Sequence, residues 1–193
     1  MTKIRSILIT GCSSGIGLDA AQTLDQLGYQ VFATARQEKD VAQLTGLGLN
    51  AHQLDVTDSA SIESALHWVL GQTDGRLDAL FNNGAYALPG ALEDISREQL
   101  RTLFETNVFG WHQLTNLCIK HMLKHNEGRI IQNSSVLGLV AMKFRGAYNA
   151  SKYAIEGLSD TLRLELRHTN IHVSLIEPGP ILSHFRANAL IQF

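Results

Sequence analysis

The sequence has few cysteines, few prolines and no long apolar run. Its two cysteines, Cys12 and Cys118, stand far apart without paired spacing, so we expect no disulfide framework and a reduced, cytoplasmic setting. No stretch approaches the roughly 20 apolar residues of a membrane-spanning helix, and the first apolar run is too short for a signal peptide. With 16 basic and 18 acidic residues the formal net charge is −2, which leaves no basic footprint for nucleic acid.

The chain instead has ample apolar material, at 45% of its 193 residues, arranged in alternating short and long segments. Short β-branched runs predict strands at 4–10, 30–35, 49–55, 77–82, 129–134 and 171–177. Longer amphipathic segments predict helices at 15–27, 39–47, 57–71, 97–109, 110–126 and 145–168. Such alternation indicates parallel strands joined by right-handed crossovers, with helices on both faces. We therefore predict a single domain over 1–193 with a Rossmann-type doubly wound α/β fold.

A glycine-rich turn lies between the first predicted strand and the first predicted helix. Glycine suits such a turn at three points: the tight bend, the approach of backbone to a pyrophosphate, and close packing of helix on sheet. The following helix N-terminus offers unpaired N–H groups to phosphates. A turn without a ligand is the alternative, but the strand–turn–helix context favours a dinucleotide site. Its candidate residues are Gly11, Ser13, Ser14, Gly15, Ile16 and Gly17.

Arg36 follows the second predicted strand, at the position that distinguishes the two nicotinamide dinucleotides. A carboxylate there would bind the ribose 2′-hydroxyl of NAD, whereas an arginine suits the 2′-phosphate of NADP. A guanidinium can hold phosphate through two parallel hydrogen bonds. The alternative is a solvated arginine that opens the next helix. We predict NADP(H) as the cofactor rather than NAD(H).

Tyr148 and Lys152 stand four residues apart in a predicted helix, so they share one helix face. A tyrosine with a pKa near 10 is a poor base, but a neighbouring cation stabilises the phenolate and makes acid–base catalysis feasible. An ordinary surface pair is the alternative. Ser135 ends the fifth strand, where a hydroxyl faces the ligand crevice of such a sheet. Asn107 interrupts a helical stretch and marks either a local kink or a functional position.

Together these motifs resemble the short-chain dehydrogenase/reductase family. The glycine turn has the form G-x-x-x-G-x-G, and Asn107, Ser135, Tyr148, Lys152 and Pro178-Gly179 follow in the family's order. The resemblance implies an NADP(H)-dependent oxidoreductase that interconverts a carbonyl and an alcohol by hydride transfer. Stretches such as Ser151–Ala154 resemble the branch of retinol- and hydroxysteroid-type dehydrogenases and bacterial aldehyde reductases, which implies a small apolar substrate.

The resemblance also implies the residue roles. Tyr148 would be the general acid/base, Ser135 would orient the substrate oxygen, and Lys152 would tune Tyr148 and hold the nicotinamide ribose. Asn107 would bind a water that links to Lys152. Further cofactor contacts would come from the adenine side, the turn after the fourth strand and the nicotinamide side, that is from Asp55, Val56, Asn82, Gly84, Pro178, Gly179, Ile181 and Ser183. For Asp55, a helix-capping role is the alternative.

The sequence departs from the family pattern at two places. Asn82-Asn83-Gly84-Ala85 exchanges the last two residues of the usual N-N-A-G, and Ala85 would be strained if that position needs a positive φ. The chain also stops at Phe193, so we expect a seventh strand and most of a substrate lid to be absent. A fragment of a longer enzyme and a naturally short member both fit that expectation.

Other features lead to negative or competing predictions. His121 and His125 have an i, i+4 spacing but no third ligand, so we expect no metal site. The family resemblance implies a homodimer or homotetramer built on helices 110–126 and 145–168. The competing function is a dinucleotide-binding module without turnover, acting as a sensor or partner.

Overall fold

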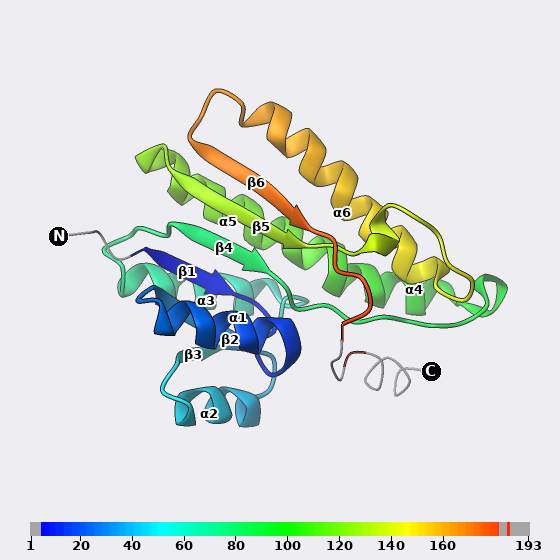
Figure 1. Cartoon of the computed structure of the whole chain (residues 1–193), viewed down its shortest axis with the longest axis horizontal. Coiled ribbons are helices and arrows are strands. Elements are labelled where there is room, and N and C mark those ends of the chain that lie inside the picture. Colours follow the sequence, from blue (N-terminus) through cyan, green and yellow to red (C-terminus); the bar gives the residue numbers. More distant parts are fainter. Residues whose placement is uncertain (1–4, 182–184, 186–193) are drawn as a thin grey trace.

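A six-stranded parallel sheet organises the computed structural model, which describes residues 5–181 and Phe185. The strand order is β3-β2-β1-β4-β5-β6, and every neighbouring pair is parallel. The order reverses between β1 and β4, which creates the crevice where such sheets bind ligands. The predicted doubly wound fold is confirmed, and Figure 1 shows the strands pointing the same way. The strands are β1 Ser6–Ile9, β2 Gln30–Ala35, β3 Asn50–Gln53, β4 Ala79–Asn82, β5 Gly128–Asn133 and β6 Ile171–Ile176.

Helices connect the strands at nearly the predicted positions. They are α1 Gly15–Gln26, α2 Glu38–Gly46, α3 Ser59–Gly71, α4 Arg97–Phe104, α5 Gly110–His125 and α6 Gly146–Glu165. Short 3₁₀ turns lie at η1 Leu92–Asp94 and η3 Val136–Gly138. The predicted helix 97–109 is wrong in its last five residues, because Glu105–Phe109 (η2) form a π-helical segment that joins α4 to α5.

Local capping chemistry sets the start of two helices. The Asp58 carboxylate accepts a hydrogen bond from the Ala60 amide at 2.9 Å and so begins α3 where the sequence predicts a helix start. Ser96 and Gln99 form a reciprocal capping box at the start of α4. Both devices satisfy backbone donors that have no partner inside the helix.

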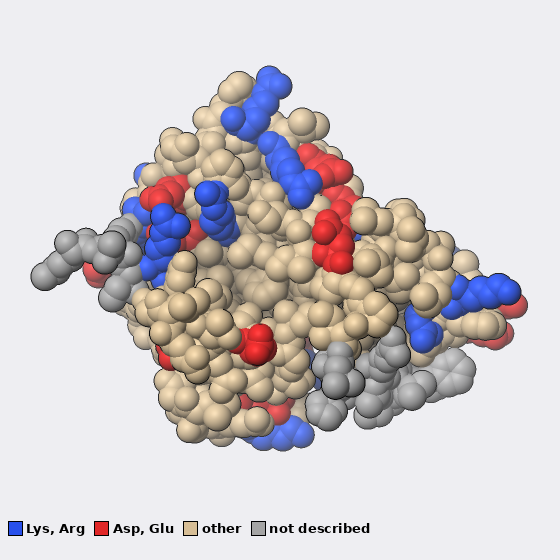
Figure 2. Space-filling view, in the orientation of Figure 1, with Lys and Arg blue, Asp and Glu red and all other residues tan. Residues whose placement is uncertain are grey.

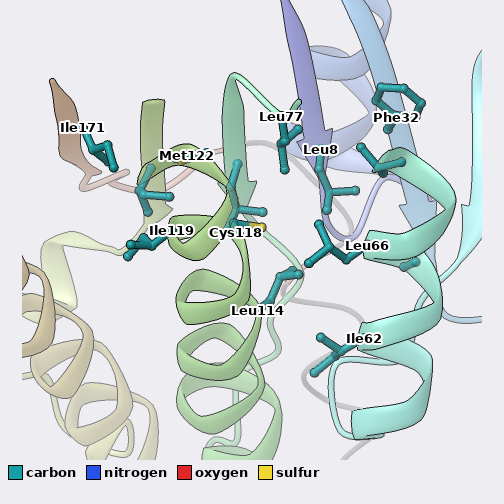
Figure 3. Close-up of a cluster of buried hydrophobic side chains, with 14 of the residues drawn as sticks. Leu8, Phe32, Ile62, Leu66, Leu77, Leu114, Cys118, Ile119, Met122 and Ile171 are labelled. Atoms are coloured by element: carbon teal, nitrogen blue, oxygen red, sulfur yellow. The ribbon is translucent and has the colours of Figure 1, made fainter. Parts of the chain in front are cut away.

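Two apolar layers hold the sheet between helices. On one face, α3 and α5 pack on the strands through side chains such as Leu66, Leu114 and Met122, which form one cluster with Leu8 and Phe32 of the sheet (Figure 3). On the other face, α1 and α2 pack on Ile7, Ile9, Val31 and neighbouring residues. Because both faces are covered there, β1 and β2 are apolar on both sides, as parallel strands require.

The described surface carries both charge signs. Among the coloured residues of Figure 2, basic and acidic side chains are interspersed, and no extended patch of one sign covers this face. No helix in the described ranges is long and apolar enough to cross a membrane.

Candidate active site

A pocket of about 600 Å³ lies at the carboxyl ends of β1, β4 and β5. Its walls come from the turns after these strands, from the start of α6 and from the segment after β6. The two charged side chains among its lining residues, Arg145 and Lys152, are both basic. Its size is that of a small-molecule or cofactor site, and its charge suits an anionic ligand.

The glycine turn forms one wall of the pocket in a conformation that side chains would not tolerate. Gly11 has φ +69°, and a Cβ there would lie 2.4 Å from the Gly84 Cα. A Cβ on Gly17 would lie 2.4 Å from the Gly11 carbonyl oxygen. Ser14 precedes α1 without capping it through its side chain, so the first-turn N–H groups are left for an anion. The turn therefore fits the pyrophosphate of a dinucleotide.

Asn83 ties this turn to β5, a role that the sequence analysis missed. Its side-chain nitrogen donates to the carbonyl oxygens of Thr10 and Gly11, both at 3.0 Å. Its side-chain oxygen accepts from the Asn133 amide at 2.8 Å. The Thr10 hydroxyl accepts in turn from the Asn83 and Gly84 backbone amides at 2.9 Å. The sequence signal that could have indicated this role is the position of Asn83, a polar residue directly after the end of β4.

Asn82 lies elsewhere, although the sequence analysis placed it among the cofactor contacts. Its fully buried side chain donates to Thr115 and Gln132, each at 2.9 Å, and does not line the pocket. Successive residues of a strand point to opposite faces, so Asn82 faces α5 while its neighbour Asn83 reaches the glycine turn.

The exchanged Gly84-Ala85 pair causes no backbone strain. Ala85 is not among the described residues with positive φ, and neither is Gly84. A Cβ on Gly84 would instead lie 3.2 Å from the Gly11 amide nitrogen, a tight contact. Glycine at 84 therefore lets two backbone segments approach closely, and the expected cost at Ala85 does not arise.

The predicted adenosine-side residues lie outside this pocket, at the ends of β2 and β3. Arg36 is exposed directly after β2, and its carbonyl accepts from the Gln53 side chain at 3.0 Å. Asp55 accepts from the amide and hydroxyl of Thr57, at 2.9 and 2.8 Å. Asp58, not Asp55, caps α3. Val56 packs against the first residue of α5, where a Cβ on Gly110 would overlap its carbonyl.

Tyr148 and Lys152 lie together on the buried face of α6. The Lys152 Nζ is 5.5 Å from the centre of the Tyr148 ring and donates to the Asn133 carbonyl at 2.6 Å. Burial raises the pKa of Tyr148 to about 12, although a hydrogen bond with Ser135 lowers that pKa in part. Burial lowers the pKa of Lys152 to about 7, opposed by the negative charge of Glu156. At neutral pH the phenol is therefore protonated, and burial outweighs the lowering of the Tyr148 pKa that the sequence predicts from a neighbouring cation.

Ser135 is held in place by the turn that follows β5. It is the N-cap of η3, where its hydroxyl accepts from the Leu137 amide at 3.1 Å. The neighbouring Ser134 hydroxyl donates to Glu156 of α6. The predicted strand end and α6 thus bring Ser135, Tyr148 and Lys152 to one pocket, as the sequence analysis expected of their positions.

Asn107 lies in the π-helical segment, fully buried and bound on both sides. Its side chain accepts from the Tyr86 amide at 3.1 Å and donates to the Tyr86 carbonyl at 2.9 Å. It also lies 3.2 Å from the Ser151 hydroxyl, which donates to the Tyr148 carbonyl at 2.8 Å. The predicted irregularity at Asn107 is real, and its side chain links the pocket wall to the helix that carries Tyr148.

The segment after β6 closes the far side of the pocket. Pro178, Gly179 and Ile181 line it, and the Pro178 carbonyl accepts from the Val136 amide at 3.2 Å. The ring of Phe185 lies 5.8 Å from that of Tyr148. Ser183, the remaining predicted contact on this side, lies outside the described residues. Among the described residues, no group of three or more His, Cys, Asp or Glu side chains could hold a metal ion. His121 and His125 belong to no such group.

The fold and the pocket together define a Rossmann-type nucleotide-binding protein. The order of strands and the glycine turn at a helix N-terminus belong to that class. The family model for short chain dehydrogenase matches residues 5–191. The chain belongs to the short-chain dehydrogenase family.

Individual relatives agree with this assignment. The chain is 47% identical over 184 residues to the uncharacterized oxidoreductase YbbO of Escherichia coli, covering 95% of this chain and 68% of that one. It is 37% identical over 198 residues to bovine retinol dehydrogenase 8, covering 97% and 62%. The chain thus spans roughly two thirds of the length of these relatives.

Solved structures match the fold closely. A variant of actinorhodin polyketide ketoreductase with NADPH has a TM-score of 0.89 and 31% identity, covering 96% of this chain and 74% of that one. A short-chain dehydrogenase/reductase from Burkholderia phymatum in complex with NAD has a TM-score of 0.90 and 26% identity, covering 99% and 71%. A nicotinamide dinucleotide is therefore the class of cofactor that these neighbours support.

Proposed function

We propose that this protein is an NADP(H)-dependent oxidoreductase that interconverts a carbonyl and an alcohol. The observation that carries the proposal is the meeting of Ser135, Tyr148 and Lys152 in the pocket whose other wall is the glycine turn. The oxidoreductase relatives support the same reaction class.

Each residue has a defined role in this proposal. A nicotinamide dinucleotide held in this pocket would supply or accept the hydride. Tyr148, protonated at neutral pH, gives its proton to the carbonyl oxygen in reduction and takes it back in oxidation. Ser135 orients that oxygen. Lys152 would hold the nicotinamide ribose and stabilise the Tyr148 phenolate by its charge. Asn107 supports a water that connects to Lys152.

The cofactor would extend across the crevice of the sheet. The glycine turn would bind the pyrophosphate, Arg36 the 2′-phosphate, and Asp55 with Val56 the adenine. On the nicotinamide side the contacts would come from Pro178, Gly179, Ile181 and Ser183. Gly84 lines the pocket, and Asn83 would act in place of Asn82 by fixing the turn.

The substrate side of the pocket supports an apolar alcohol or carbonyl compound. Its lining includes Ala87, Pro89, Val136, Leu137 and Met142. The similarity to retinol dehydrogenase 8 agrees with such a substrate. The same inference extends to a cytoplasmic setting, supported by two buried free cysteines, and to a homodimer or homotetramer through α5 and α6. Exposed apolar residues such as Leu158 and Leu164 on α6 support that interface.

The test is NADPH oxidation by a panel of apolar aldehydes and ketones, on wild type and on Tyr148→Phe. The variant keeps the ring and removes the proton, so we expect its turnover to fall by a factor of about 10² to 10⁴. Its affinity for NADPH should stay within a few-fold of wild type. Tight NADPH binding by wild type with no turnover of any compound supports the non-catalytic module instead.

A further inference from the structure

The side chain of Trp111 lies against Lys152 in the interior of the protein. Trp111 is the second residue of α5, and its side chain is fully buried. The Lys152 Nζ lies 4.5 Å from the centre of its ring. We propose that Trp111 is a positioning residue, which holds the Lys152 ammonium on its ring face and the glycine turn through its N–H. This inference rests on the proposed function.

The N–H side of the indole reaches the cofactor wall of the pocket. Nε1 donates to the Gly84 carbonyl at 2.8 Å. Gly84 lies directly against Gly11, where a Cβ would come within 2.4 Å of its Cα. One side chain therefore connects the turn that would hold the pyrophosphate with the lysine that would hold the ribose. Such a connection fixes the distance between the two groups.

The face of the indole ring contacts the Lys152 ammonium, which is buried away from water. Lys152 is 1% exposed, and its one hydrogen bond in the described structure goes to the Asn133 carbonyl. An indole face is the best aromatic partner for a cation, and the attraction grows when both groups are desolvated. The contact favours the charged form of Lys152, which the proposed reaction needs.

The effect of the Trp111 ring on the pKa of Lys152 can be distinguished from the effects of the other groups around the ammonium. Its own helix brings Glu156, whose charge raises the pKa of Lys152, and Tyr148, which is neutral at pH 7. From β5 it meets the neutral Asn133 carbonyl, and from α5 the Trp111 ring. Removing the ring should therefore lower the pKa of Lys152 further, whereas a purely space-filling role would leave that pKa unchanged.

The experiment compares Trp111→Leu, which removes the ring, with Trp111→Phe, which keeps a ring face but loses the N–H. Trp68→Phe is the matched control, because Trp68 stacks on His52 and meets Phe32 at β2 and β3. The readout is the pH profile of kcat/KM for carbonyl reduction, which should fall as Lys152 loses its proton. We expect Trp111→Leu to move that alkaline limb down by about one pH unit. In Trp111→Phe the alkaline limb should stay close to its wild-type position, because a ring face remains. Trp68→Phe should not move the limb.

The inference is overturned if folded Trp111→Leu keeps the alkaline limb of kcat/KM at its wild-type pH. It is also overturned if Trp111→Phe moves that limb as far as Trp111→Leu does. If wild type shows no turnover, the proposed function fails, and a second measurement tests Trp111 alone. In Trp68→Phe, Trp111 is the sole remaining tryptophan. Its emission should titrate between about pH 6 and pH 9 and lose that titration when Lys152→Met is added. Emission that is flat, or that still titrates without Lys152, contradicts the inference.

Discussion

At the scale of single residues, burial governs the protonation of the two groups that would perform the chemistry. It raises the pKa of Tyr148 to about 12 and lowers that of Lys152 to about 7. The two shifts have the same cause and opposite signs because burial disfavours whichever form is charged. The protein therefore holds a neutral phenol beside a lysine that can titrate near neutral pH.

The shift at Lys152 predicts how stability depends on pH. In the unfolded chain the lysine keeps its proton up to about pH 10.5, whereas the folded lysine loses it above about 7. The unfolded lysine thus binds more protons than the folded one in this window, so Lys152 should make the free energy of unfolding rise with pH, by about 1 kcal/mol per pH unit. Urea unfolding between about pH 7.5 and 9 measures this slope.

Lys152→Met is the comparison for that slope. It should flatten the dependence relative to wild type in the same window. The buried Cys12 and Cys118 act in the other direction in both proteins as the unfolded thiols lose their protons around pH 9.0, because burial raises the pKa of both thiols, that of Cys12 to about 12. Equal slopes for wild type and Lys152→Met below pH 9 would show that Lys152 is not buried as described.

Gly17 provides a prediction about the glycine turn. In Gly17→Ala, the new Cβ would meet the Gly11 carbonyl oxygen at 2.4 Å, so the turn must shift. We expect a loss of about 1–3 kcal/mol in the free energy of unfolding and weaker NADPH binding. Gly46→Ala is the matched control, since Gly46 ends α2 with open space around it and should be neutral or stabilising by up to about 1 kcal/mol. Equal effects of the two substitutions contradict the described packing.

The sequence predicts residues whose role depends on spacing along one element better than those that depend on contacts between elements. Tyr148 and Lys152 follow from one helical turn. The choice between Asn82 and Asn83 depends on which face each presents at the end of β4, and the pattern at a strand end does not settle that. The contact of Trp111 with Lys152 joins α5 to α6 and has no local signal, so the sequence does not predict it.

At the scale of elements, the π-helical segment is the largest departure from the sequence prediction. The sequence predicts two helices at 97–109 and 110–126 with little to separate them. The structure joins them through Glu105–Phe109, where the wider turn places Asn107 against Tyr86 and Ser151. Such insertions are frequent at functional sites. A hydrophobic periodicity of 3.6 cannot predict them, because they are defined by one extra residue in the turn.

Asn107→Ala tests the importance of this segment for the fold. The substitution leaves the Tyr86 amide and carbonyl without their partners, so we expect a loss of about 2–4 kcal/mol in the free energy of unfolding. Thr106→Ala in the same segment is the control, because its hydroxyl makes only a 3.5 Å contact, and it should change stability by less than about 0.5 kcal/mol. Chemical denaturation compares them. A near-neutral Asn107→Ala would mean that the segment does not depend on these bonds.

The ends of the strands show why element boundaries are harder to predict than elements. Leu49 and Leu54 flank β3, and because both are apolar the sequence predicts a strand over 49–55. Both side chains are indeed buried, at 5% and 4% exposure. The ladder with β2 pairs only Asn50–Gln53. Apolar residues mark what is buried, and burial continues into turns where the backbone no longer pairs.

At the scale of the whole molecule, the sheet brings four separate parts of the chain to one pocket. The turns after β1, β4 and β5 and the segment after β6 all line it, because parallel strands end on the same side of the sheet. This arrangement is what the sequence predicts well, since the alternation of strands and helices fixes it. The chain spans roughly two thirds of the length of the named relatives.

The cofactor is the claim on which the whole account depends. Arg36 is exposed directly after β2, where we propose that it binds the 2′-phosphate of NADP, and the described pocket carries basic rather than acidic side chains. A charge-assisted pair of this kind predicts a preference for NADPH over NADH of about tenfold or more. Arg36→Asp should remove it, while Arg101→Asp, the same charge change on the exposed side of α4, should not.

The most direct measurement is a fluorescence titration of NADPH and of NADH into wild type, Arg36→Asp and Arg101→Asp. The account predicts tight NADPH binding by wild type and by Arg101→Asp, and no preference between the nucleotides in Arg36→Asp. Folded wild-type protein that binds neither nucleotide would contradict the account.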